Sequence, residues 1–255
     1  MWPPEKALPP LDCHAHVAPD VTPRQVAELE GAQVFAVTRS LAEAARVADR
    51  RDVGLVWGLG VHPGDGAARS AFDLATLGGL LDRFVLIGEI GVDRHGGDVA
   101  RQQQILDEIL GSLQGRAVLV SLHSTGAIDE VLEAVSQRPS GGAILHWFTG
   151  NSSQVERAAA LGCYFSVNAA MSDEQLARLP PDRILPETDF PSSRRRTGAR
   201  RPGDLLAIET RLEMVWSGTE VSVRRQFYRN LRELTITSRA IERLPEVLVD
   251  LLLVA

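Results

Sequence analysis

Short apolar segments rich in β-branched residues recur along the chain, and stretches with helical apolar spacing or with turn residues separate them. This alternation predicts repeated units of one strand followed by one helix. We expect eight strands, over residues 11–17, 33–38, 55–61, 84–92, 117–123, 143–148, 163–168 and 183–189. Eight such units predict an α/β fold in the form of a TIM-like (β/α)8 barrel.

Several of the intervening segments carry residues that typically begin helices. Ser40 with Glu43, and Ser153 with Glu156, have the spacing of a capping box. Pro23 stands at an expected first helical position, where its missing N–H costs nothing. These features support helices between the strands.

The last part of the chain has a different pattern. A loop rich in Ser, Arg, Gly and Pro is expected over residues 192–203, followed by helices over 204–216, 222–234 and 238–254. We find no internal repeat and no long linker, so we expect one domain over residues 1–255. Its strand-bearing core spans 11–234, and a helical C-terminal extension spans 235–255.

The extension carries apolar residues at roughly helical spacing, namely Leu244, Val247, Leu248, Leu251 and Leu252. We expect this face to be buried against the barrel of its own chain. An interface with a partner protein is the alternative.

Length and composition suit this fold. A chain of 255 residues, 44% of them hydrophobic, can bury the core of one barrel-sized domain. Cys13 and Cys163 lack any paired metal-ligand spacing and are expected as buried thiols in a reducing cytosol. The N-terminus has no secretory-signal pattern, and the apolar run 247–255 is too short, and interrupted by Asp250, to cross a bilayer. We therefore expect a cytoplasmic protein with no membrane association.

Histidines and carboxylates gather where a barrel has its active site. His14 and His16 are two residues apart on the first expected strand, so their side chains share one face and can share an ion. In a parallel barrel, active-site groups lie at the C-terminal ends of the strands. Four further candidates fall at or near such ends: Glu89, His123, His146 and Asp189.

Four imidazoles and two carboxylates exceed the usual needs of one ion. Ligands of this kind suit Zn, Mn, Mg or similar divalent ions without identifying which one. Two metal ions that share a carboxylate are therefore expected.

The scarcity of lysine separates two groups of barrel hydrolases. Barrels with a His-x-His first strand often belong to the amidohydrolase group, in which a carbamylated lysine after strand four bridges two metals. Here the only lysine, Lys6, precedes the first strand, and Glu89 occupies the strand-four position. We therefore expect a carboxylate bridge in place of the lysine.

Five motifs then carry a resemblance. They are Leu-Asp-Cys-His-Ala-His, Gly-Val-His-Pro, Ile-Gly-Glu-Ile-Gly-Val-Asp, Leu-His-Trp-Phe-Thr-Gly and Pro-Glu-Thr-Asp-Phe-Pro. In content, order and spacing they resemble the TatD family of metal-dependent deoxyribonucleases. The resemblance covers residues 11–234 and includes Asn230, which is similar to a late asparagine of the family.

The resemblance implies a metal-dependent hydrolase barrel and a role for each candidate. His14, His16, Glu89 and Asp189 would hold one metal, and Glu89, His123 and His146 the other. His62 would contact a substrate phosphate. Glu89 and Asp189 would be the catalytic carboxylates, with Asp189 accepting a proton from water. The implied activity is hydrolysis of phosphodiesters in nucleic acid, with single-stranded DNA expected first and RNA as the alternative.

Two departures from the family pattern bear on the substrate. Ser124 and Thr125 stand where the family usually has Arg-Asp, and Arg94 and His95 stand where it has aromatic residues. Hydrolysis of an amide, a lactone or an aminoacyl ester on the same metals is therefore an alternative. TatD-like subunits also occur in phage-defence assemblies such as Qat, so a role there with protein partners, even a non-catalytic one, is another.

Charge gives the last candidates. The formal net charge of -6 disfavours a surface that binds nucleic acid everywhere, but not a local basic patch. The loop after the eighth strand contains Arg194, Arg195, Arg196, Arg200 and Arg201, and we expect the first three to bind substrate phosphates. Trp147 is a candidate for stacking on a base. The alternative for the loop is a solvated basic surface.

Overall fold

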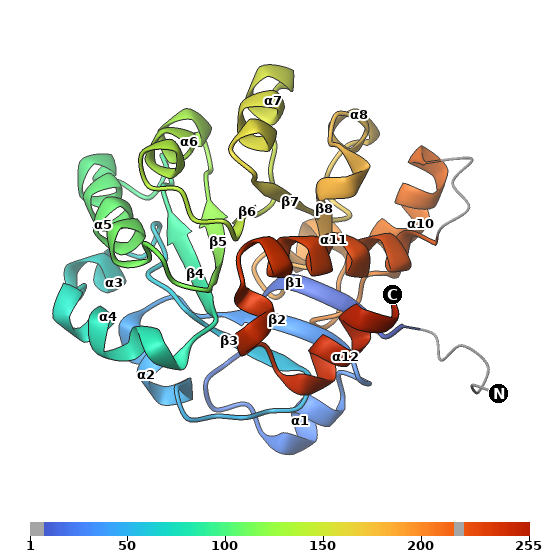
Figure 1. Cartoon of the computed structure of the whole chain (residues 1–255), viewed down its shortest axis with the longest axis horizontal. Coiled ribbons are helices and arrows are strands. Elements are labelled where there is room, and N and C mark those ends of the chain that lie inside the picture. Colours follow the sequence, from blue (N-terminus) through green and yellow to red (C-terminus); the bar gives the residue numbers. More distant parts are fainter. Residues whose placement is uncertain (1–7, 217–221) are drawn as a thin grey trace.

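The structure is a computed structural model that describes residues 8–216 and 222–255 (Figure 1). Eight parallel strands follow one another around the sheet in chain order, and helices surround them. The α/β barrel prediction is confirmed. The strands are β1 (Leu11–His16), β2 (Gln33–Val37), β3 (Leu55–Leu59), β4 (Leu86–Gly91), β5 (Leu119–His123), β6 (Ala143–Leu145), β7 (Tyr164–Val167) and β8 (Ile184–Pro186).

Backbone hydrogen bonds join the first strand to the segment after the last. The N–H of Asp189 donates to the carbonyl of His14 at 2.9 Å, and the N–H of His16 donates to the carbonyl of Phe190 at 2.7 Å. The barrel therefore closes through the backbone of three candidate ligands, His14, His16 and Asp189.

A buried carboxylate reinforces this closure. Asp12 accepts hydrogen bonds from the N–H and the hydroxyl of Thr188, at 3.0 and 2.6 Å, and from the N–H of Gly203 at 2.8 Å. Burial raises its pKa to about 6 against the opposing effect of these donors. Asp12 thus ties β1 to the chain that follows β8.

The helices before residue 190 alternate with the strands. They are α1 (Pro23–Ala27), α2 (Leu41–Val47), α3 (Gly66–Ser70), α4 (Leu74–Leu80), the short 3-10 helix η1 (Leu81–Arg83), α5 (Val99–Ser112), α6 (Ile128–Gln137), α7 (Ser152–Ala160), α8 (Asp173–Ala177) and the 3-10 helix η2 (Pro181–Arg183). In Figure 1 the longer ones form an outer ring.

The helix starts agree only in part with the sequence patterns. Pro23 does occupy the first turn of α1. Ser40 caps α2 by accepting from the N–H of Glu43, but the Glu43 carboxylate accepts from the N–H of Arg39, so the box is incomplete.

The capping box predicted from Ser153 is wrong. Asn151 and Gln154 form it instead, because α7 begins two residues earlier than the prediction assumed. An asparagine is as good an N-cap as a serine, and its position here decides the start of the helix.

Two strands end three residues earlier than expected. β6 ends at Leu145 rather than at residue 148, and β8 ends at Pro186 rather than at residue 189. Trp147 and Asp189 have φ values of 41° and 47°, which take the backbone out of the extended conformation. Both side chains are therefore presented by turns beyond the strands.

The C-terminal part contains α9 (Arg194–Thr197), α10 (Leu206–Val215), α11 (Val223–Thr237), η3 (Ala240–Arg243) and α12 (Glu246–Val254). The loop predicted over 192–203 thus includes one helical turn, α9. The helix predicted over 238–254 is broken in two, because Pro245 lacks the N–H that a continuous helix needs there.

One face of α12 packs against the rest of the chain. Leu248 and Leu252 are fully buried and Leu244 is nearly so, whereas Val247 and Leu253 are exposed. Burial of the extension is confirmed for this face. No helix in the described ranges is long and apolar enough to span a membrane. That residues 1–255 act as one domain stays a prediction.

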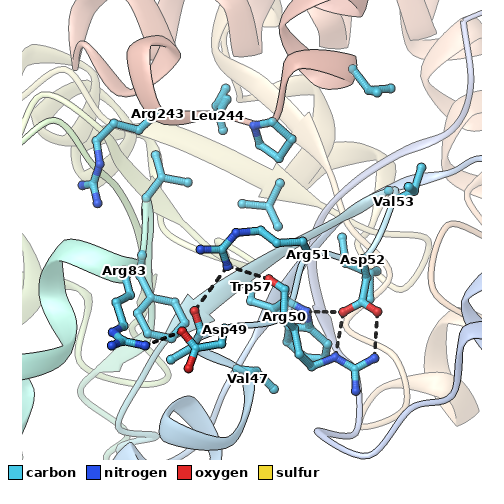
Figure 2. Close-up of a pocket in the computed structure, with 18 of the residues that line it drawn as sticks. Val47, Asp49, Arg50, Arg51, Asp52, Val53, Trp57, Arg83, Arg243 and Leu244 are labelled. Atoms are coloured by element: carbon cyan, nitrogen blue, oxygen red, sulfur yellow. Dashed lines mark hydrogen bonds and ion pairs between the residues drawn. The ribbon is translucent and has the colours of Figure 1, made fainter.

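A cavity of about 580 Å³ lies at the amino-terminal end of the barrel, between the α2–β3 turn, η1 and the start of α12 (Figure 2). Arg50 pairs with Asp52 at 2.7 Å, and Arg83 pairs with Asp49. Arg243 donates to the backbone carbonyls of Ala117 and Asp82. The Arg243 contacts link the C-terminal segment to the end of the barrel opposite the candidate ligands.

We predict that Leu248→Ala lowers the free energy of unfolding by about 2–5 kcal/mol, because it leaves a cavity beneath α12. Val247→Ala, on the exposed side of the same helix, should change it by no more than about 0.5 kcal/mol. Urea denaturation followed by circular dichroism measures both. Equal effects of the two variants would show that α12 does not contribute to the core.

Candidate metal centre

The structure brings all six predicted metal ligands to the carboxyl end of the barrel. His14 and His16 come from β1, Glu89 from β4 and His123 from the end of β5. The turns after β6 and β8 supply the other two, His146 and Asp189. All of these side chains except that of His16 are in buried residues, and His16 is half-buried.

The Glu89 carboxylate stands at the centre, and its two oxygens face different histidines. Oε1 lies 2.5 Å from Nδ1 of His123 and 3.1 Å from Nε2 of His146. Oε2 lies 3.7 Å from Nε2 of His14 and 3.3 Å from Nε2 of His16. The carboxylate therefore faces two groups of ligand atoms at once.

His62 also belongs to this cluster. Its Nε2 lies 3.4 Å from Oε2 of Glu89, and its Nδ1 accepts a hydrogen bond from the N–H of Gly64. The donor atoms of His62, Glu89 and His123 lie close enough together to hold an ion. Two other sets do as well, His14 with Glu89 and His146, and His14 with His16 and Asp189. The sequence predicted only a phosphate contact for His62.

Polar groups behind three of the histidines fix how their rings are turned. Nδ1 of His14 lies 2.8 Å from the hydroxyl of Ser121. Nε2 of His123 lies 3.2 Å from the carboxylate of Asp93. The opposite nitrogen of each ring then points at Glu89. Groups of this kind orient ligands in metal sites and set which nitrogen is free.

Glu187 lies behind His146 at ion-pair distance, although Nδ1 of His146 has no hydrogen-bond partner. Its Oε2 lies 3.4 Å from Nδ1 of His146, and it accepts hydrogen bonds from the hydroxyl of Ser166 and the side-chain amide of Asn168. Glu187 was not among the site residues predicted from the sequence. A usable signal was present, because Glu187 stands two residues before Asp189 in the Pro-Glu-Thr-Asp motif.

Several buried atoms of the cluster have no hydrogen-bond partner, among them Nε2 of His14, Nδ1 of His16 and Oε2 of Glu89. Buried polar atoms normally find a partner. Imidazole nitrogens and a carboxylate oxygen are also the donors that zinc, manganese and similar ions take. The residues present therefore fit a metal centre.

The electrostatics of the cluster are consistent with this. Burial raises the pKa of Glu89, but the neighbouring charges of His146 and His123 outweigh it and hold this pKa well below its usual value. Burial lowers the pKa of His14 to about 4 and raises that of Asp189 to about 7. A metal ion takes the place of protons in such a cluster, because an imidazole ligand must be neutral.

Two glycines allow β4 to carry Glu89 into the barrel. A Cβ atom on Gly88 would lie 2.7 Å from Cβ of Ser121, and one on Gly91 would lie 2.0 Å from the carbonyl oxygen of His123. The register with β5 shifts between Ile87 and Ile90, as at a bulge. Side chains at the two glycines would push β4 away from β5.

Beside the cluster lies a cavity of about 400 Å³. Some of the predicted substrate-binding residues line it and others do not. His62, Trp147 and Arg196 line it, together with Ser192 and Thr149. Arg194 and Arg195 are exposed and do not line it. Phe148, next to Trp147, is buried in the core against Phe165.

The family model for TatD related DNases matches residues 11–235. The chain belongs to the TatD-related DNase family. A Klebsiella pneumoniae protein named a 3'-5' ssDNA/RNA exonuclease TatD is 29% identical over 186 residues, which are 63% of this chain and 69% of that protein. A Cronobacter sakazakii protein of the same name is 33% identical over 158 residues, 56% of this chain and 60% of that protein.

Two further similar proteins extend the comparison. The Bacillus subtilis protein YabD, described as an uncharacterized metal-dependent hydrolase, is 26% identical over 52% of this chain and 57% of its own length. Among solved structures, the TatD homologue YJJV of Escherichia coli matches with a TM-score of 0.72 at 23% identity, over 88% of this chain and 97% of that chain. The structural likeness confirms the fold.

One departure of this TatD-family chain has a structural role. Arg94, in place of an aromatic residue, donates from Nε to the carbonyl of Gly126 at 2.7 Å and pairs with Glu130. It thereby links the turn after β4 to the turn after β5. His95 is exposed and lies outside the cavity.

We predict that Glu187→Gln weakens the binding of a divalent ion by about 10- to 100-fold, because His146 loses the carboxylate that orients its ring. Glu156→Gln, an exposed position on α7, should leave the affinity unchanged. Calorimetric titration of protein stripped with a chelator measures both. An unchanged affinity of the Glu187 variant would rule out this positioning role.

Proposed function

We propose that the chain is a metal-dependent nuclease that hydrolyses phosphodiesters of nucleic acid, with single-stranded DNA as its first substrate. The observation that carries the proposal is the Glu89 carboxylate, whose two oxygens face two groups of histidines. The names of the two exonuclease relatives support the substrate class. The cytoplasmic location and any protein partners stay predictions.

The cluster would hold two divalent ions that share Glu89. His14, His16 and Asp189 would complete the ligands of one ion, in agreement with one set of close donor atoms. His123 and His146 would complete those of the other, because both face Oε1 of Glu89. Divalent ions at these positions would lower the pKa of a bound water and would place positive charge opposite the phosphoryl oxygens. Zn, Mn and Mg are the candidate ions.

The residues of the chain have distinct tasks in this proposal. Asp189 lines the cavity, 3.7 Å from Nε2 of His16, so its carboxylate is placed to accept the proton of an attacking water. His62 lies at the same wall and presents its Nε2 toward Glu89, where it would contact the phosphate that is cleaved.

Metal removal tests the activity directly. We expect protein dialysed against a chelator to lose hydrolysis of a labelled single-stranded oligonucleotide, and Mn²⁺, Mg²⁺ or Zn²⁺ to restore it. Amide, lactone and aminoacyl ester substrates, assayed in parallel with each ion, separate the nuclease from other hydrolases. Turnover of one of these substrates without release of nucleotides would overturn the proposal.

The bridging role of Glu89 gives a second expectation. Glu89→Gln keeps nearly the same volume but removes the charge between the two histidine groups. Turnover should therefore fall by at least about 100-fold, which is more than the usual effect of removing a group that only orients a metal ligand. Metal content per chain, measured by mass spectrometry, should fall as well, while near-UV circular dichroism stays the same. Full activity with one ion per chain would contradict a shared carboxylate.

A further inference from the structure

Arg196 is held against an aromatic ring at the mouth of the cavity. Its guanidinium carbon lies 4.5 Å from the centre of the Trp147 ring, within the range of a cation–π contact. The two residues come from different elements, since Arg196 lies in α9 and Trp147 in the turn after β6. The contact favours one position of the exposed Arg196 side chain over the ring.

The charge of Arg196 is not neutralised by a carboxylate in the described part of the chain. Two neighbouring arginines differ in this respect. Arg200 pairs with Asp204 at 3.2 Å, and Arg201 pairs with Glu30 at 2.6 Å. Of the five arginines in this loop, Arg196 is the one that lines the cavity beside the metal cluster.

The geometry also limits what Trp147 does. A guanidinium covers one face of its ring, so that face is not free to stack on a base. The guanidinium itself keeps its N–H donors, which lie in the plane of the group and match the oxygens of a phosphate. Ser192 and Thr149, which line the same cavity, add hydroxyl donors near the rim.

We propose that Arg196, positioned by Trp147, forms a subsite for a second phosphate of the substrate strand, next to the phosphate that is cleaved. This inference rests on the proposed nuclease function and adds to it a specificity residue. It implies that the enzyme favours a strand with several phosphates over a small diester with one. It also assigns the phosphate contact to Arg196 and not to Arg194 or Arg195.

Kinetics of Arg196→Ala test the subsite. The KM for a single-stranded oligonucleotide should rise about tenfold or more, while kcat stays within about twofold, because one lost charged contact weakens binding of ground state and transition state alike. The KM for bis(4-nitrophenyl) phosphate should not change. The slope of log KM against log salt should fall by about 0.7 for the strand, as for one lost phosphate contact.

Two further variants separate charge from structure. Arg200→Ala removes the same charge from the same loop, but its guanidinium is already paired, so the KM and the salt slope should stay at the parent values. Trp147→Phe retains an aromatic face and should keep most of the affinity, whereas Trp147→Ala should raise the KM in the same direction as Arg196→Ala.

Binding measured without turnover keeps this test independent of the nuclease proposal. Fluorescence anisotropy of a labelled oligonucleotide, with Glu89→Gln as the parent, should show at least about a tenfold weaker Kd after Arg196→Ala. If the natural chain hydrolyses no oligonucleotide but Arg196→Ala still weakens binding, the nuclease proposal is refuted and the phosphate subsite is supported. Equal binding by the Arg196→Ala and Arg200→Ala variants would overturn the subsite.

Discussion

The buried carboxylate of Glu89 is the constraint on which the site depends. A charged carboxylate removed from water costs several kcal/mol unless opposite charge and hydrogen-bond donors compensate for it. Five imidazoles surround this one at 2.5 to 3.7 Å. Gly88 and Gly91 let its strand approach β5 closely enough to place it there. The negative charge of Glu89 is therefore surrounded by imidazoles, and a bound divalent cation would compensate it further.

Polar side chains behind the histidines orient the rings of this cluster. Ser121, Asp93 and Glu187 each face the outer nitrogen of one histidine, so the inner nitrogens converge before any substrate arrives. The strands and the turns directly after them carry this machinery. Under the proposed function, contacts with the rest of the substrate would fall to α9 and the turn after β6, which lie beside the cluster.

Much of this arrangement follows from patterns along the chain. The rule that active-site groups end the strands of a parallel barrel is enough to bring His14, Glu89 and His123 together. Other features depend on contacts that a sequence does not display. Glu187 matters because of how the ring of His146 is turned. Arg201 pairs with Glu30, which is far away in sequence, so the number of arginines in the loop does not show which of them have a partner. The positive φ values at Trp147 and Asp189, two and three residues after β6 and β8 end, are also not visible in the sequence pattern.

Closure of the barrel through His14 and His16 bears on how the protein is made. The backbone of these residues forms hydrogen bonds with Asp189 and Phe190, and their imidazoles belong to the cluster. The barrel and the cluster are therefore completed together. A chain still growing on the ribosome holds the first histidines long before the segment around residue 189 has emerged. The donor set that includes Asp189 is therefore complete only after the segment beyond the last strand has been made, whereas the atoms of His62, Glu89 and His123 come from earlier parts of the chain.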